Sequence, residues 1–187
     1  MKSRILICLV ALLLSSCAYY TLVETQRQKM SEVYSVDPQI NWSRSKESTV
    51  EIWTVDGPFL QAVRFFDGVA DGDGLFRTTD PTKKFPVFHA DMKATEIQEM
   101  VVDTIANMGA GNVQASNLRP FKFGALPGFR FEVEFLSDEG LELEGLVAGA
   151  THKQRLYLIV YSGTRAHYFG KHKDDVERML SSIQTGV

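Results

Sequence analysis

Cysteine is scarce in this chain of 187 residues, which contains two, Cys8 and Cys17, both near the N-terminus. The rest of the chain therefore forms no disulfide of its own and offers no thiol for nucleophilic catalysis. We expect the fold to be stabilised by packing alone. An apolar fraction of 44% and a charged fraction of 23% are typical of a globular domain that can bury a core.

An excess of positive charge is also missing, because the formal net charge is −3. Loss of Lys2 and Arg4 with a cleaved leader peptide would make the remaining chain more negative still. A nucleic-acid partner normally requires a basic patch, so we expect none. The same balance argues against a polybasic contact with a membrane surface.

Recognisable catalytic patterns are absent too. The serines lie in no Gly-x-Ser-x-Gly elbow, and the four histidines form no His-Glu-x-x-His pair on a helix. No glycine-rich phosphate loop opens a helix after a strand. We therefore expect a non-enzymatic protein that carries no cofactor.

Long hydrophobic runs are missing except at the N-terminus, where residues 5–14 are unbroken apolar. Ten residues cannot span a bilayer, which takes about 20 in a helix. A basic start at Lys2 and Arg4, followed by a short apolar run, is typical of a secretory signal. The run ends in Leu14-Ser15-Ser16-Cys17, which resembles the lipobox of bacterial lipoproteins. That resemblance implies cleavage before Cys17 and a lipid on its sulfur; an ordinary secretory signal is the alternative.

Lipid on Cys17 would attach the protein to a membrane. One acyl chain binds only weakly, whereas the two or three chains of a bacterial lipoprotein, palmitate among them, are enough for stable anchoring. Residue 18 is alanine, not the aspartate that resembles an inner-membrane retention signal. We therefore expect a cell-envelope protein, on the periplasmic face of the outer membrane if the cell is Gram-negative.

The chain is expected to divide into a signal peptide at 1–16, a tether at 17–33 and one globular domain at 34–187. Residues 18–32 are polar after two tyrosines and favour a short helix or a loose segment. The length that remains fits a single domain.

Apolar periodicity predicts two helices and several strands. Apolar residues recur at three- and four-residue steps over 93–108 and 167–183, which indicates amphipathic helices. Asp56-Gly57 between two alternating runs indicates a hairpin turn. The expected strands are 49–55, 59–66, 113–119, 129–136, 141–151 and 156–161, the last apolar on both faces and therefore central.

This order predicts an α+β fold, an antiparallel β-sheet with two main helices packed on it. It resembles the PsbP-like superfamily, an α/β/α sandwich, through the Trp53 hairpin, the strands around Phe131 and Leu143, and the run 156–161 before the last helix. The resemblance implies a non-enzymatic accessory, assembly or binding module, and it carries over no site residue.

The loop 67–74 contains Asp67, Asp71 and Asp73 between glycines and is one candidate cation site. Calcium prefers several oxygen ligands from a flexible turn. The EF-hand spacing fails, however, because Phe76 stands where that loop needs glycine and Thr82 where it needs an acid. A plain loop is the favoured interpretation.

Four glutamates, Glu132, Glu134, Glu142 and Glu144, form a second candidate. Two pairings keep the apolar sides of both strands on one core. The first sets Glu134 opposite Glu142 and Glu132 opposite Glu144, and the second sets Glu134 opposite Glu144. We favour a solvated face partly offset by Arg130; the alternative is a surface for a cationic partner or a weak divalent site.

Aromatic residues offer a third possibility, a groove lined by some of Trp53, Phe121, Phe123, Tyr157 and Tyr161, although aromatic residues in strands are more often core. We expect a membrane-anchored envelope lipoprotein that acts as a non-catalytic protein-binding or assembly module, with an envelope protein as partner. The alternative is a carrier or sensor of a small apolar or lipid ligand.

Overall fold

The structure is a computed structural model that describes residues 20–47, 50–78 and 84–186. Cys17 and the expected signal peptide lie outside these residues. Neither helix in the described part of the chain is long and apolar enough to cross a membrane.

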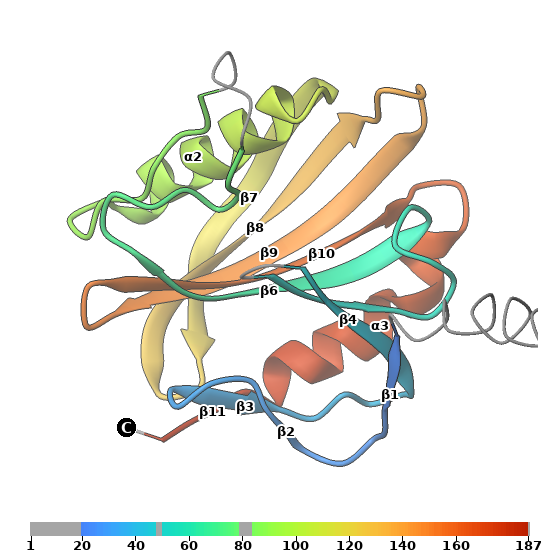
Figure 1. The fold of residues 1–187 in the computed structure, drawn as a ribbon, viewed down its shortest axis with the longest axis horizontal. Coiled ribbons are helices and arrows are strands. Elements are labelled where there is room, and N and C mark those ends of the chain that lie inside the picture. The colour runs from blue at the N-terminus through green and yellow to red at the C-terminus, as the bar shows by residue number, and fades with distance from the viewer. Residues whose placement is uncertain (1–19, 48–49, 79–83, 187) are drawn as a thin grey trace, which may run out of the picture.

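An antiparallel sheet of eight strands forms the middle layer, in the order β1-β4-β5-β6-β10-β9-β8-β7 (Figure 1). A small second sheet has the order β11-β3-β2. The strands of the large sheet are β1 Thr21–Val23, β4 Trp42–Glu47, β5 Val50–Thr54, β6 Gln61–Ala70, β7 Gly111–Phe123, β8 Leu126–Leu136, β9 Glu142–His152 and β10 Arg155–Thr164. Those of the small sheet are β2 Gln28–Lys29, β3 Tyr34–Val36 and β11 Gln184–Thr185.

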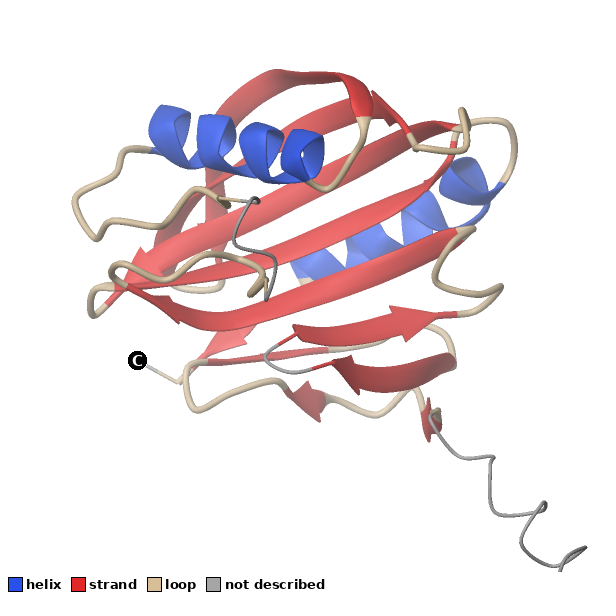
Figure 2. Ribbon diagram, turned by 45° about the horizontal axis from the view of Figure 1, so that its top comes forward, coloured by secondary structure: helices blue, strands red, loops and turns tan. Residues whose placement is uncertain are grey.

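Two helices cover opposite faces of the large sheet, α2 (Ala94–Asn107) on one and α3 (Tyr168–Ser181) on the other (Figure 2). The protein is therefore an α/β/α sandwich, and the predicted α+β class is confirmed. Central strand β10 is buried on both sides, as expected for 156–161. Leu158 packs in the core under α2, whereas Ile159 packs in the core under α3.

Each helix follows from its apolar stripe. Helix α2 buries Ile97, Met100 and Val101 against the sheet. It begins where the Lys93 amide donates to the Glu96 carboxylate at 2.7 Å. It ends before Gly109, whose φ of +106° is a left-handed conformation that favours glycine. The predicted ranges 93–108 and 167–183 thus match both helices to within two residues.

The segment expected to be a tether contributes to the fold. Residues 21–23 form β1, which pairs with β4, and residues 28–29 form β2. The side chains of Val23 and Trp42 are both buried in the core under α3. Ordered structure therefore begins well before residue 34, because the segment pairs with the edge of the sheet and buries Val23 in the core.

Candidate functional site

The acidic surface at the end of the β8–β9 hairpin surrounds an arginine. Glu134 lies opposite Glu144, so the second of the two expected registers is the one observed. Arg165, directly after β10, binds Glu134, donates from Nε to Glu144 at 2.7 Å and lies 3.4 Å from Glu142. The bonds to Glu134 and Glu144 raise the pKa of Arg165. A cationic partner at these glutamates would have to compete with this guanidinium.

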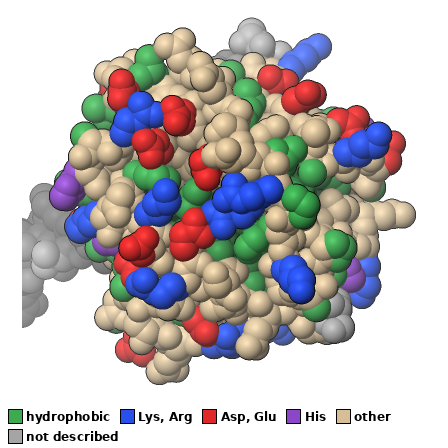
Figure 3. All heavy atoms as spheres, turned by 180° about the vertical axis from the view of Figure 1, so that it is seen from behind, with side chains coloured by type: hydrophobic (Ala, Val, Ile, Leu, Met, Phe, Trp, Pro, Cys, Tyr) green, Lys and Arg blue, Asp and Glu red, His purple; other side chains and the backbone are tan. Residues whose placement is uncertain are grey.

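Glu132 lies two residues before Glu134 on the same face of β8, opposite Leu146, and has contacts of its own. It accepts a bond of 2.7 Å from Asn117 and lies 3.7 Å from Arg119. Figure 3, from the side opposite to Figure 1, shows acidic and basic side chains intermingled. A partner surface at the four glutamates stays a prediction, and internal arginines already compensate much of its charge.

Arg130, expected to offset the acidic face, instead joins β8 to α3. Its guanidinium forms a two-pronged bond to Glu177, at 2.6 and 2.9 Å. This bond raises the pKa of Arg130 and lowers that of Glu177. Such paired bonds hold an arginine in one orientation, so they stabilise the packing of the helix on the sheet.

The three aspartates of the candidate cation loop do not converge, in line with the plain loop that the sequence favours. Asp67 lies in β6, and burial raises its pKa. Asp71 accepts a bond of 2.9 Å from the Ala90 amide, and the Asp73 carbonyl accepts one of 2.8 Å from the Phe88 amide. Over the described ranges, no three His, Cys, Asp or Glu side chains are grouped so that they could hold a metal ion.

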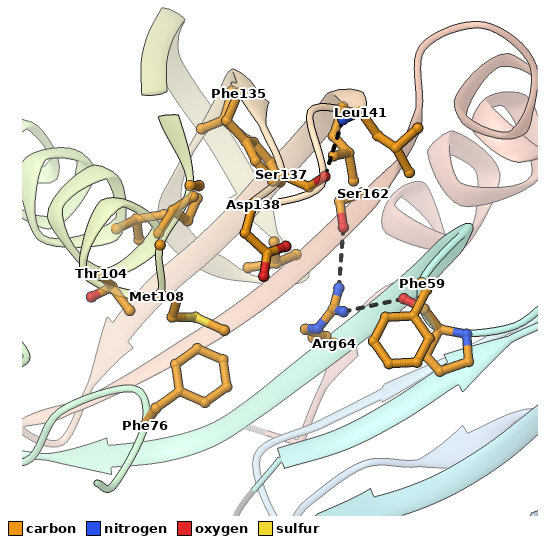
Figure 4. Close-up of a pocket in the computed structure, with 18 of the residues that line it drawn as sticks. Phe59, Arg64, Phe76, Thr104, Met108, Phe135, Ser137, Asp138, Leu141 and Ser162 are labelled. Atoms are coloured by element: carbon orange, nitrogen blue, oxygen red, sulfur yellow. Dashed lines mark hydrogen bonds between the residues drawn. The ribbon is translucent and has the colours of Figure 1, made fainter. Parts of the chain in front are cut away.

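An apolar cavity of about 320 Å³ opens on the α2 side of the sheet. Its walls are the end of α2, the tip of the β8–β9 hairpin and the turn before β6, and its floor is the sheet (Figure 4). We call it the α2 cavity. The side chains that give it its apolar character include Phe66, Leu75, Phe76, Val101, Ile105, Met108, Val133, Phe135, Leu143 and Val160.

Three large apolar side chains at the rim of the α2 cavity are exposed to solvent. Phe59 is 89% exposed, Met108 51% and Leu141 43%. Phe59 stands on the tight turn after Gly57, whose φ of +107° and carbonyl bond to Gln61 reverse the chain. Exposed apolar residues grouped at one opening mark binding surfaces more often than scattered ones do.

The floor of the α2 cavity carries a cation. Arg64 extends from β6 and donates to the Ser162 hydroxyl at 3.1 Å and to the Pro58 carbonyl at 3.4 Å. Figure 4 shows its guanidinium between Phe59 on one side and Phe76 with Met108 on the other. The lining of the cavity thus combines apolar walls with a few polar and charged side chains, among them Arg64 at the floor and Asp138 and Glu139 in the β8–β9 turn, which is the usual composition of a small-molecule site.

A partly buried polar contact fixes the turn that carries Phe59. His172 of α3 is buried, and its Nε2 lies 2.9 Å from Asp56. Lys171 donates to the same carboxylate at 2.7 Å. Burial raises the pKa of Asp56, but the bonds from Lys171 and His172 outweigh it and hold the pKa below its usual value. Helix α3 therefore positions one rim of a cavity on the opposite face of the sheet.

The aromatic residues proposed for a groove do not line the α2 cavity. Trp53, Phe123, Tyr157 and Tyr161 are buried in the core under α3, and Phe121 packs against that core. The core interpretation is therefore confirmed for them. The cavity uses other aromatic residues, Phe59, Phe66, Phe76 and Phe135. The sequence feature that could have indicated this cavity is Phe59, a large apolar residue that directly follows Gly57-Pro58 in a turn.

Comparison with known proteins identifies the fold. No family model matches the chain, and no curated protein matches it. Among solved structures, it is similar to the solution structure of cyanobacterial PsbP from Synechocystis. The two share 13% sequence identity and a TM-score of 0.56 over 92% of this chain and 98% of that one. The protein therefore has a PsbP-like fold, as its order of elements predicts.

Proposed function

We propose that this protein is a non-catalytic binding module of the cell envelope, held at a membrane by lipid on Cys17. The Leu14-Ser15-Ser16-Cys17 sequence after a short apolar run supports the anchor. The α2 cavity supports binding, and it is the observation that carries the proposal. Its volume is within the range of small-molecule sites, about 300–1,000 Å³.

The anchor is tested by labelling cells with radioactive palmitate. Cys17→Ala should abolish incorporation into the protein, since no other residue is expected to receive lipid. Cys8→Ala is the matched control, because Cys8 lies inside the expected signal peptide, and it should leave labelling unchanged. Labelling that persists in the Cys17 variant would contradict the anchor.

The occupant that the geometry favours is a small apolar or lipid ligand. The sheet forms the floor of the α2 cavity, and walls enclose it on three sides. A compact apolar group can therefore move out of water and into the cavity. Burial of each methylene contributes about 0.8 kcal/mol. A carrier or sensor of such a ligand is therefore the function that we place first.

Val160→Trp provides the test, because Val160 lies on the cavity floor and a larger ring would fill the space. Lipids that copurify with the wild-type protein should be lost from this variant in native mass spectrometry. Leu22→Ser is the control, since Leu22 is an exposed apolar residue of β1 outside the cavity lining. Equal lipid content in all three proteins would contradict the proposal.

A second function, docking of an envelope protein, is favoured by the exposed Phe59. A partner could insert an apolar side chain beside it, as at many interaction hot spots. Crosslinking in intact cells distinguishes the two functions. A stoichiometric partner that is lost in Phe59→Ser supports docking, whereas bound lipid without a partner supports the carrier.

A further inference from the structure

Exposed apolar side chains gather on one side of the molecule. In the described part of the chain, the large apolar side chains that are exposed are Tyr20, Leu22, Val55, Phe59, Val87, Met108 and Leu141. Three of them, Phe59, Met108 and Leu141, share the rim of the α2 cavity. Val55 begins the turn that carries Phe59, and Tyr20 and Leu22 belong to the N-terminal segment at the edge of the sheet.

Strand pairing places this N-terminal segment beside the β5–β6 turn, residues 55–60. Leu22 of β1 lies opposite Ser43 of β4, and Ser43 lies opposite Thr54, the last residue of β5. Neighbouring strands are about 4.8 Å apart, so Leu22 is about 10 Å from the strand end that leads into the turn. Figures 1 and 2 both show β1, the β5–β6 turn and the tip of the β8–β9 hairpin along the same side of the molecule.

We call this the apolar side and define it by Tyr20, Leu22, Val55, Phe59, Met108 and Leu141. Val87 does not belong to it. The neighbouring Phe88 exchanges backbone bonds with Gly72 and Asp73, just beyond the far end of β6. Strand β6 begins after the β5–β6 turn and has ten residues, so its two ends are about 30 Å apart. Exposed apolar residues therefore mark one end of the sheet.

The chain that leads to Cys17 departs from the same side. Cys17 precedes Tyr20 by three positions, so the chain between them can cover about 10 Å at most. A bilayer that holds lipid on Cys17 would therefore lie close to the apolar side. Grouped apolar side chains on a protein surface mark contacts with membranes as well as contacts with proteins.

We infer that the apolar side rests on the bilayer that holds the lipid of Cys17, with Phe59 at the boundary between headgroups and acyl chains. This inference rests on the proposed anchor and adds an orientation to it. Phe59 is 89% exposed in water, so it has the most apolar area to bury at this boundary. Because Phe59 also forms the rim of the α2 cavity, the cavity would open towards the membrane from which a lipid ligand comes.

Charge does not drive this contact. Lys171 is paired with Asp56 of the β5–β6 turn, and Arg165 is paired with glutamates of the β8–β9 hairpin. Asp138 and Glu139 at the tip of that hairpin are exposed and acidic. These groups offer no attraction to anionic lipids, so burial of apolar area has to hold the contact. The contact should therefore form on uncharged bilayers and persist when the salt concentration is raised.

Tryptophan quenching tests the orientation, with the full lipidated chain in phosphatidylcholine vesicles whose acyl chains carry bromine. Val55→Trp and Val87→Trp are matched variants, because these valines are 41% and 37% exposed and neither lines the α2 cavity. The native Trp42 and Trp53 are buried, and their emission is subtracted with the wild-type protein. Brominated lipid should remove most of the added emission in Val55→Trp and leave that of Val87→Trp unchanged. Phe59→Ser in the Val55→Trp background should restore most of the lost emission.

Flotation of the vesicles distinguishes failure of the orientation from failure of the anchor. A wild-type protein that does not float with the vesicles would overturn the anchor and the orientation together. A protein that floats but is quenched equally in both variants, or in neither, would overturn the orientation alone and leave Phe59 to an envelope protein. If Val55→Trp does not fold, hydrogen exchange of the wild-type protein decides. Residues 55–60 should exchange more slowly on vesicles than in soluble Cys17→Ala, whereas residues 84–92 should not; equal exchange at 55–60 would overturn the orientation.

Discussion

The two faces of the sheet are built from the same alternating strands, yet one is closed and the other open. Under α3, the layer between helix and sheet is filled by fully buried side chains, among them Trp53, Phe65 and Tyr161. Under α2, the core is filled beside Ile97 and Met100 but opens where the helix ends at Asn107. An open cavity thus arises from where a helix stops, without any change in the pattern of the strands beneath it.

The largest effect should follow from breaking the closed face. Trp53→Ala removes a fully buried indole and should reduce the free energy of unfolding by about 3–5 kcal/mol. Phe135→Ala, beside the α2 cavity, should cost roughly half as much, because Phe135 is only partly buried. Urea unfolding of both variants checks the difference; equal losses would show that the two faces are equally packed.

A smaller loss is expected where the strands approach most closely. A methyl group at Gly149 would lie 2.5 Å from the Leu158 side chain and 2.7 Å from the Tyr157 carbonyl. Gly149→Ala should therefore destabilise the protein by about 1–3 kcal/mol through overpacking. Gly170→Ala is the control, because a methyl group added there would meet no atom of the described residues within 4 Å apart from its own stretch of helix. Thermal unfolding that is unchanged in Gly149→Ala would be inconsistent with this packing.

The bond between α3 and the sheet should make stability depend on pH. Arg130 lowers the pKa of Glu177 in the folded protein, so its contribution is present above the unfolded pKa, about 4.3. This contribution to stability is lost as the pH falls through the lower pKa that Glu177 has in the folded protein. Because Glu177 is partly exposed, Glu177→Gln should cost only about 0.5–1 kcal/mol at pH 7 and little at pH 3. Unfolding at both pH values measures this; a constant difference would contradict it.

The smallest change in stability is expected at the open face. Phe59→Ser alters a side chain that is 89% exposed, so the free energy of unfolding should stay within about 0.5 kcal/mol of wild type. Binding at the α2 cavity should nevertheless weaken, since Phe59 forms its rim. Parallel measurements of unfolding and of copurifying lipid by native mass spectrometry check this separation. A large loss of stability would mean that Phe59 supports the fold.

The sequence predicts the parts of this fold that repeat locally. Phe129, Phe131 and Val133 alternate with charged residues and indicate their strand directly, and both helical stripes are equally clear. The β1–β4 pairing could not be read in the same way. Thr21–Val23 is too short for a periodic signal, and it pairs with residues 42–44, about twenty positions away.

The candidate site was predicted less well than the fold, because it depends on distances between elements. Glu134, Glu142 and Glu144 were expected as a group, but Arg165 follows a later strand and joins them only in three dimensions. In the sequence, Arg64 likewise is one polar residue within a strand, and nothing in that pattern indicates that it lies at the floor of a cavity. A cavity depends on where α2 and the β8–β9 turn end, and apolar spacing does not specify end positions.

The pairing of β1 with the sheet also limits the distance between the folded domain and Cys17. Cys17 precedes Thr21, the first residue of β1, by four positions, so extended chain can cover only about 14 Å between them. With lipid on Cys17, the edge of the sheet would stay within that radius of the bilayer surface. The domain would then diffuse within a thin layer above its own membrane, so that its encounters with a partner would be nearly two-dimensional. It would not reach a partner on a distant membrane.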